Sequence, residues 1–391
     1  MRRVGLLLAT AAIALPTTGD AHAWAPKGFV GTVLPFASRC ATFDQAGNCL
    51  SDQDLGRMRE SHVRIVRWGL RWSRIQPFRL LPPNWRATDA VIGSLASRGV
   101  RVLPVLTGSP SWAAKTPETP PLDSRIAREG WRQFVTAAVR RYGPGGQYWT
   151  TRYQRQFPGG SSRPITTWQV WNEQNLVHTF QPRPSPRRYA RLLRITHPGI
   201  ATQDPDATIL LGGMPGFVSP HSWHYLDDLY RQPGIKRRFD AVALHPYAPD
   251  LNHVTLQLKR IRRVMRAHHD GRSPIWITEL GWGSDPPDSF GVNAGLEGQR
   301  RKLERVLPRL IRDRHRWRLE HVLWFDWRDP PPRPGRCSFC ESAGLFWHDQ
   351  TPKPAWQAFK QVVRYGRQPL PARATRCVPG PGPDRPPAGG T

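Results

Sequence analysis

Two short segments of the chain each run from an apolar, aromatic-rich stretch directly into a glutamate. They are Trp168 to Glu173 (WQVWNE) and Pro274 to Glu279 (PIWITE). An apolar run of this length predicts a buried strand, and a glutamate at its carboxyl end lies where the chain leaves the core for a loop. Two carboxylates that meet in one site can divide proton transfer and nucleophilic attack between them. The pair therefore predicts a two-carboxylate site.

The two glutamates can meet only if the strands that carry them belong to one sheet. One β/α unit takes about 30 to 40 residues, so the interval between Glu173 and Glu279 corresponds to about three units. We expect both glutamates at the carboxyl ends of strands in one closed ring, which is the end that carries the chemistry in barrel enzymes.

Eight apolar stretches predict strands, and they alternate with helical patterns, which favours parallel β/α units over a sandwich. The predicted strands are Phe29 to Leu34, Val63 to Trp68, Val100 to Leu106, Thr166 to Trp171, Thr208 to Gly212, Ala241 to Leu244, Pro274 to Thr278 and His321 to Phe325. The predicted helices are Ser51 to Ser61, Thr88 to Ser97, Ser124 to Tyr142, Ser185 to Thr202, His221 to Tyr230, Asn252 to His268, Leu296 to His315 and Pro354 to Val363. This alternation predicts an α/β fold, a (β/α)8 TIM barrel, in a single domain of residues 24–366.

Two segments do not follow the alternating pattern. Residues 143–164 are rich in Gly, Tyr and Trp and are expected to form a surface loop. Residues 367–391 are rich in Pro and Gly with few apolar residues, which predicts an irregular tail.

The amino terminus has the pattern of a secretory signal peptide. Arg2 and Arg3 precede an apolar run, and Ala21-His22-Ala23 supplies a cleavage site. Removal of residues 1–23 predicts a secreted, extracellular protein. No later apolar run approaches the ~20 residues needed to span a bilayer, so we expect no membrane insertion.

The chain is strongly basic, with a formal net charge of +28 and 57 lysines and arginines, of which seven are lysines. The arginines are scattered along the helical stretches, as on a solvated surface. The alternative is attraction of an anionic polysaccharide or cell-surface glycopolymer, because summed positive potential concentrates polyanions. The chain has no zinc-finger spacing, RNA-binding aromatic signature or compact basic stripe, which argues against nucleic acid as a partner.

The five cysteines fit an oxidising compartment, where most should pair. Cys40 and Cys49, which flank a turn-rich segment, predict a disulfide, while Cys337, Cys340 and Cys377 compete for a second one. The C-x-x-C pair has no partner half-site with zinc spacing, so no metal site is predicted.

Four motifs at predicted strand ends resemble one enzyme group. They are Trp171-Asn172-Glu173 after the fourth strand, His245-Pro246-Tyr247 after the sixth, Glu279 after the seventh and Trp324 near the end of the eighth. Together they resemble the clan A retaining glycoside hydrolases, with the nearest likeness to families 5 and 39. The resemblance implies cleavage of O-glycosidic bonds in a poly- or oligosaccharide by double displacement, without a cofactor. It implies Glu173 as the acid/base and Glu279 as the nucleophile.

The chemistry of this reaction sets requirements for the two glutamates. Retention needs one carboxyl to protonate the leaving oxygen and another, about 5 to 5.5 Å away, to attack the anomeric carbon. The acid has to hold its proton near neutral pH, so we expect apolar surroundings and the neighbouring negative charge to raise the pKa of Glu173.

The resemblance also implies supporting residues. Asn172 would hydrogen-bond the sugar 2-hydroxyl, and Tyr247 would donate to Glu279. Arg67, closing the second predicted strand, would lie beneath Glu279 and keep it ionised, or else would bridge surface loops. His245 would line the site, or else would cap a backbone carbonyl.

Three tryptophans, Trp112, Trp282 and Trp324, are candidates for a sugar platform. A flat indole buries the C–H face of a pyranose while its N–H bonds a hydroxyl. The alternative is that these large side chains belong to the core.

The chain departs from the family pattern after the acid/base residue, where Gln174 stands in place of proline. Glutamine restores an N–H group and backbone freedom, so we expect the rim on the aglycone side to differ from that of other members.

Two other function classes stay open: a non-catalytic carbohydrate-binding barrel, and a charge-driven binder of acidic cell-surface glycopolymer. A binding protein has no chemical need for two adjacent carboxylates, which favours the enzyme.

Overall fold

The computed structural model describes residues 26–34, 50–332 and 337–365 of the 391-residue chain. The predicted signal peptide, the predicted tail and the expected Cys40–Cys49 disulfide lie outside these ranges. Among the helices within them, none combines the length and the apolar character needed to cross a bilayer.

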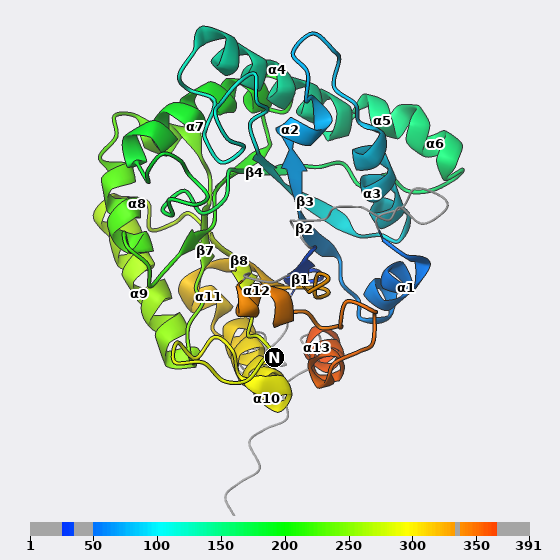
Figure 1. Cartoon of the computed structure of the whole chain (residues 1–391), viewed down its shortest axis with the longest axis vertical. Helices are drawn as coiled ribbons and strands as arrows, with labels where there is room; N and C mark the ends of the chain where they lie inside the picture. The colour runs from blue at the N-terminus through cyan, green and yellow to red at the C-terminus, as the bar shows by residue number, and fades with distance from the viewer. Residues whose placement is uncertain (1–25, 35–49, 333–336, 366–391) are drawn as a thin grey trace, which may run out of the picture.

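Nine parallel strands form one curled sheet (Figure 1). They are β1 (Val30–Val33), β2 (Ile65–Arg71), β3 (Arg101–Thr107), β4 (Thr167–Val170), β5 (Thr208–Leu211), β6 (Met214–Pro215), β7 (Val242–His245), β8 (Ile275–Leu280) and β9 (Leu319–Trp324). Their order in the sheet is β5-β4-β3-β2-β1-β9-β8-β7-β6. The N–H of Leu211 donates to the carbonyl of Ala241 at 3.1 Å, which joins β5 to the residue before β7. The sheet therefore curls until its two edges meet.

The predicted α/β class and parallel sheet are confirmed, and each of the eight predicted strands is present. The ninth strand, β6, follows β5 after Gly212 and Gly213. A Cβ atom at Gly213 would overlap the imidazole of His245. Glycine at this position lets the backbone pass close to the histidine, and β5 is interrupted there.

Helices surround the sheet on its outer side (Figure 1). Those that match the predicted helices are α1 (Asp52–Glu60), α3 (Arg86–Ser97), α4 (Arg125–Tyr142), α7 (Pro186–Ala201), α8 (Ser222–Tyr230), α9 (Leu251–Ala267), α10 (Gly295–Arg312) and α13 (Pro354–Tyr365). The short helices are α2 (Trp72–Ile75), α5 (Gln147–Thr150), α6 (Arg152–Gln156), η1 (Ile235–Arg238), α11 (Arg314–Trp317) and α12 (Ser338–Ser342). Ser124 and Ser185 cap α4 and α7 by accepting a backbone N–H, as residues at these positions commonly do.

The prediction that residues 143–164 form a surface loop is wrong. This segment contains α5 and α6 and buries Tyr148, Trp149 and Tyr153. The Tyr148 hydroxyl donates to the carbonyl of Asp89 at 2.8 Å, and Trp149 Nε1 donates to the carbonyl of Tyr142 at 2.8 Å. Satisfied polar atoms allow these large aromatic side chains to be buried.

Two apolar cores lie on the two faces of the sheet. The larger one, the outer core, packs against the helices. The smaller one, the inner core, lies inside the ring and consists of Val33, Ile65, Leu103, Leu210, Ala241, Ala243, Trp276 and Leu323. Because side chains alternate along a strand, Ile65 faces inward, Val66 faces the helices and Arg67 faces inward again.

A bulge in β8 changes this alternation at the site. Ile277 pairs with Val322, and Leu280 pairs with Trp324, so β8 holds one more residue than β9 over this interval. Ile277 and Leu280 both belong to the outer core. A bulge re-aims side chains next to active sites. Thr278 and Glu279 therefore both contact residues inside the ring.

Candidate active site

The two predicted glutamates meet inside the ring at the carboxyl ends of its strands. A carboxylate oxygen of Glu173 lies within 4.8 Å of one of Glu279, with a ring nitrogen of His245 within the same distance of both. The Glu279 residue is 5% exposed, and the Glu173 side chain is 15% exposed. This separation agrees with the roughly 5 to 5.5 Å that retaining glycosidases use. It is shorter than the roughly 6.5 to 9.5 Å that inverting enzymes use to accommodate a water beside the sugar.

Glu279 is held by two partners. One guanidinium nitrogen of the fully buried Arg67 forms an ion pair with Oε1, and the Tyr247 hydroxyl donates to Oε2 at 2.6 Å. The guanidinium fixes one oxygen of the carboxyl group and the phenol fixes the other. Arg67 and Tyr247 thus lie where the resemblance implied, and Arg67 does not bridge surface loops.

Arg67 also orients two amides on β4 and its end. It donates to Asn172 Oδ1 at 2.6 Å and to Gln169 Oε1 at 2.6 Å. Since the oxygen of Asn172 faces Arg67, its amide nitrogen points elsewhere, and this nitrogen has no hydrogen-bond partner among the described residues. Asn172 is therefore placed to donate to a ligand hydroxyl.

His245 lies between the two carboxylates. Its Nδ1 is 2.9 Å from Glu173 Oε1 and 3.3 Å from Glu279 Oε2, and its Nε2 is 3.0 Å from Thr278 Oγ1. The alternative that His245 caps a backbone carbonyl is wrong, because these partners are all side chains. Burial lowers the pKa of His245 to about 3; Glu279 opposes this shift and Arg67 adds to it. The imidazole is therefore neutral at neutral pH.

Glu173 has the environment of a proton donor. Burial raises its pKa to about 7, against the opposing positive charges of Arg67 and His178. Burial is thus the main cause, rather than the neighbouring carboxylate. The backbone of Glu173 is left-handed, with φ 46°, a conformation that few residues other than glycine adopt and that concentrates at functional sites.

The Gln174 side chain lies in the interior, and the expected difference of the rim from other members stays a prediction. Its side chain is fully buried, and its Nε2 donates to the carbonyl of Gly212 at 3.0 Å. The neighbouring Asn175 is also buried and donates to the carbonyls of Pro215 and Pro220 at 3.0 and 3.1 Å. Both amides tie the end of β4 to the segment after β5, so they stabilise the loop that carries Glu173.

The prediction that Trp282 and Trp324 form a sugar platform is wrong, because both side chains are buried. Both residues are 0% exposed and lie in the outer core, with ring centroids 6.1 Å apart. A side chain without exposed surface offers no face to a ligand. Trp112 is partly exposed and packs edge-on against Trp72 with centroids 4.9 Å apart, so its role in a sugar platform stays a prediction.

The aromatic surface next to Glu279 comes from two residues that the sequence interpretation missed. Phe339 lies 4.9 Å from the ring of Tyr247 and 5.7 Å from that of Phe325, and both phenylalanines are partly exposed. Phe325 packs against the inner core, as its position two residues after the inward-facing Leu323 requires. In Figure 1, α12, which carries Phe339, is drawn beside β8 and β1, inward of α10 and α13.

A disulfide closes the turn that presents Phe339. It joins Cys337 and Cys340, which settles one of the open pairings in favour of the C-x-x-C pair. The Phe339 side chain lies between the two cysteines in sequence, so the motif C-S-F-C could have pointed to it.

Glu173, His245 and Glu279 are also the one group in the described part of the chain whose donor atoms could hold a metal ion. His245 Nδ1 already contacts a carboxyl oxygen of each glutamate, and the Arg67 guanidinium contacts Glu279. A buried positive charge opposes a second cation at this distance. The arrangement therefore suits proton transfer and nucleophilic attack better than metal binding.

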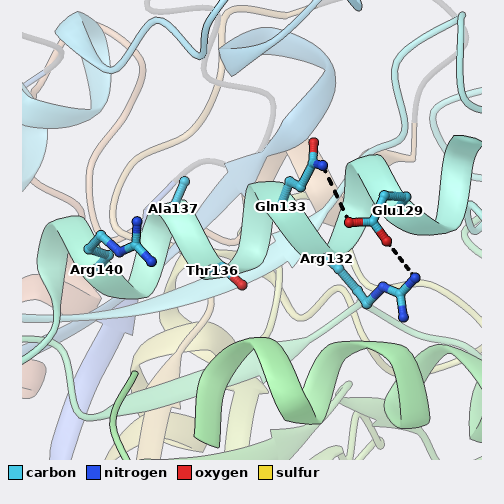
Figure 2. Close-up of a pocket in the computed structure, with 6 residues that line it drawn as sticks. All are labelled: Glu129, Arg132, Gln133, Thr136, Ala137 and Arg140. Atoms are coloured by element: carbon cyan, nitrogen blue, oxygen red, sulfur yellow. Dashed lines mark hydrogen bonds and ion pairs between the residues drawn. The ribbon is translucent and has the colours of Figure 1, made fainter. Parts of the chain in front are cut away.

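A separate hollow of about 530 Å³ lies on the outer side of α4 (Figure 2). It is lined by Glu129, Arg132, Gln133, Thr136, Ala137 and Arg140. Glu129 accepts hydrogen bonds from Arg132 and Gln133. None of the strand-end residues lines this hollow, so it is distinct from the glutamate site.

No protein-family model matches the sequence, and no curated protein is significantly similar to it. Solved structures share its fold. A family 39 glycoside hydrolase from Bacteroides cellulosilyticus WH2 superposes with a TM-score of 0.60 and 19% identity, over 89% of this chain and 65% of that one. A GH39 β-xylosidase from Caulobacter crescentus gives 0.62 and 16%, over 88% and 73%. A GH5_18 protein from Streptomyces cattleya, in complex with GlcNAc, gives 0.62 and 17%, over 89% and 82%.

The chain thus shares its fold with solved structures of glycoside hydrolases. The three structures named above belong to families 39 and 5, the two families that the strand-end motifs resemble. The chain spans 65% of the first of these neighbours. At these identities the likeness concerns the fold, so function has to be argued from the site.

Proposed function

We propose that the protein is a retaining glycoside hydrolase that cleaves O-glycosidic bonds of a poly- or oligosaccharide by double displacement. The observation that carries this proposal is the pair of carboxylates within 4.8 Å of each other in unlike environments. Glu279 accepts an ion pair and a phenol hydrogen bond, whereas Glu173 has a pKa of about 7. Pairs of carboxyls whose environments differ in this way divide the acid and nucleophile roles.

In the first step, Glu279 attacks the anomeric carbon while Glu173 gives its proton to the leaving oxygen, so that the glycosidic bond breaks and a glycosyl ester forms. In the second step, Glu173, now ionised, takes a proton from water, and the resulting hydroxide oxygen attacks the anomeric carbon and releases Glu279. The amide nitrogen of Asn172 donates to the sugar 2-hydroxyl, a bond that strengthens as positive charge develops.

Contact with the sugar ring falls to Phe325 and Phe339, in place of the buried tryptophans. Both rings are partly exposed beside Tyr247, which itself contacts Glu279. An aromatic face next to the nucleophile can bury the apolar face of a pyranose. Trp112 would contribute further out, on the loop after β3.

The stereochemistry of hydrolysis tests this proposal. The protein would be screened against 4-nitrophenyl β-glycosides and against plant, fungal and bacterial polysaccharides, including acidic ones. For a substrate that is cleaved, proton NMR of the first product should show the anomeric configuration of the substrate. Inversion would contradict double displacement. Saccharide binding without turnover would favour the carbohydrate-binding barrel, and salt-sensitive binding that persists in Glu173→Gln would favour the binder of acidic glycopolymer.

We also propose that the enzyme is exported, on the basis of the signal-peptide pattern in residues 1–23. The amino-terminal sequence of protein recovered from culture medium should begin at Trp24. Recovery from the cytoplasm with an intact amino terminus would contradict export.

A further inference from the structure

A row of buried side chains connects the arginine beneath one glutamate to the histidine beside the other. It runs from Arg67 through Gln169 and Thr278 to His245, and all four residues have 0% exposure. Gln169 and Thr278 have no part in the chemistry proposed above. Their hydrogen bonds nevertheless determine where protons can lie around Glu173.

The amide of Gln169 has a single allowed orientation. Arg67 Nε carries only a hydrogen to donate, so the Gln169 atom 2.6 Å from it has to be the oxygen. The carbonyl of Leu211 can only accept, so the Gln169 atom 3.0 Å from it has to be the nitrogen. The same nitrogen faces Thr278 Oγ1 at 3.3 Å and donates to it.

The hydrogen bond that Thr278 accepts from Gln169 determines which hydrogen bond it makes with His245. Its hydroxyl oxygen accepts from Gln169, which leaves its one hydrogen to donate, and His245 Nε2 lies 3.0 Å away. If Nε2 carried a proton instead, the Thr278 hydrogen would have no acceptor among the described residues, at a fully buried position where unmade bonds cost about 1 to 3 kcal/mol. A neutral imidazole carries one proton, which is therefore on Nδ1.

We propose that Gln169 and Thr278 hold His245 in the Nδ1-protonated form, and that this keeps the catalytic proton of Glu173 on Oε2. The Nδ1 hydrogen is donated to Glu173 Oε1, 2.9 Å away, and a neutral carboxyl accepts best through the oxygen that carries no hydrogen, which places its own proton on Oε2. Oε2 of Glu173 has no hydrogen-bond partner among the described residues and can meet the leaving oxygen. The other tautomer would accept the Glu173 proton on Nδ1 and withhold it from the substrate. The part of this inference that concerns Glu173 rests on the proposed function.

Nitrogen NMR of the full chain labelled with 15N-histidine tests the tautomer without any substrate. His245→Gln identifies the His245 signals by their disappearance. Between pH 5 and 8 the wild type should show a protonated Nδ1 and an unprotonated Nε2. A protonated Nε2 overturns the proposal, whether or not the protein hydrolyses a glycoside.

Variants of Thr278 test the cause. Thr278→Val removes the hydroxyl with little change in shape, and the His245 signals should move toward a mixture of tautomers. Thr278→Ser should restore the wild-type pattern. Thr196→Val is the matched control, because Thr196 is equally buried and its hydroxyl bonds Trp131 and Leu192, which are not part of the row. Unchanged His245 signals in Thr278→Val overturn the proposal.

Kinetics provide the functional readout. With a cleaved glycoside, Thr278→Val should lower kcat about tenfold, a part of the ~10²- to 10⁴-fold that general acid catalysis supplies, with KM within about twofold. Thr278→Ser should recover kcat. If no glycoside is cleaved but the NMR pattern is as expected, the proposed function fails and the assigned tautomer stands.

Discussion

Arg67 and Glu279 form an ion pair in which the arginine side chain has no exposed surface and the glutamate exposes 7%. They come from β2 and β8, and both face the inside of the ring. Both charges have been removed from water, so loss of one partner leaves the other uncompensated, which costs about 3 to 5 kcal/mol. The pair thereby fixes the position of the carboxyl group of the proposed nucleophile.

Replacement of Arg67 by lysine should show that its shape matters as much as its charge. Lysine keeps the charge but cannot contact Glu279, Asn172 and Gln169 together, as the guanidinium does. We expect Arg67→Lys to lower kcat/KM by about 100-fold, which is roughly 2.7 kcal/mol of transition-state stabilisation. Steady-state kinetics measure this. Arg191→Lys, at an exposed arginine on α7, is the control, and equal kinetics of both variants would contradict the assigned role.

Removal of the proposed nucleophile should abolish hydrolysis and permit chemical rescue. In Glu279→Ala, azide can enter the vacated space and attack the anomeric carbon, giving a glycosyl azide with the configuration opposite to that of the substrate. In Glu173→Ala, azide should instead attack the glycosyl ester and give the retained configuration. Proton NMR distinguishes the two products. Glu297→Ala, at a glutamate whose side chain is 52% exposed, should remain active, and swapped configurations would exchange the two roles.

The raised pKa of Glu173 should appear in both activity and stability. Activity should fall as the pH rises through about 7, because the acid loses its proton. In the unfolded chain the same carboxyl ionises near pH 4.5, so its contribution to folding is fully present below that pH and is lost as the pH rises through 7. Glu173→Gln should therefore match the wild type at pH 4 and exceed its free energy of unfolding at pH 8 by up to about 3 kcal/mol. Urea unfolding at both pH values measures this difference, and a difference independent of pH would refute the assignment.

Phe339 should contribute to substrate affinity more than to the chemical step. Loss of one aromatic contact is worth about 0.5 to 1.5 kcal/mol, so Phe339→Ala should raise KM about 3- to 10-fold with kcat little changed. Phe339→Trp should keep the wild-type KM. Cys337→Ser opens the turn that presents Phe339 and should raise KM by a smaller factor. Leu256→Ala, on α9 outside the ring, is the control. A wild-type KM in Phe339→Ala would remove Phe339 from the proposed sugar surface.

Local sequence patterns predicted the strands and helices well, because burial and helical periodicity depend on neighbouring residues. They did not predict the face of the sheet on which a side chain lies, because a shift of one residue reverses it. Trp324 and Phe325 are adjacent, and the alternation of the strand places the indole in the outer core and the phenyl ring at the site. The bulge in β8 interrupts this alternation, so the adjacent residues Thr278 and Glu279 both face the inside of the ring.

The sequence by itself determined that two strand-end carboxylates, an arginine and a tyrosine belong to one α/β sheet, because element type and strand ends depend on short-range patterns. The tertiary structure alone decided that Glu173 and Glu279 come within 4.8 Å, that His245 lies between them, and that Gln169 and Thr278 reach it. Such distances join residues from different strands. They depend on sheet curvature, strand register and the bulge, which are set by packing of the whole chain.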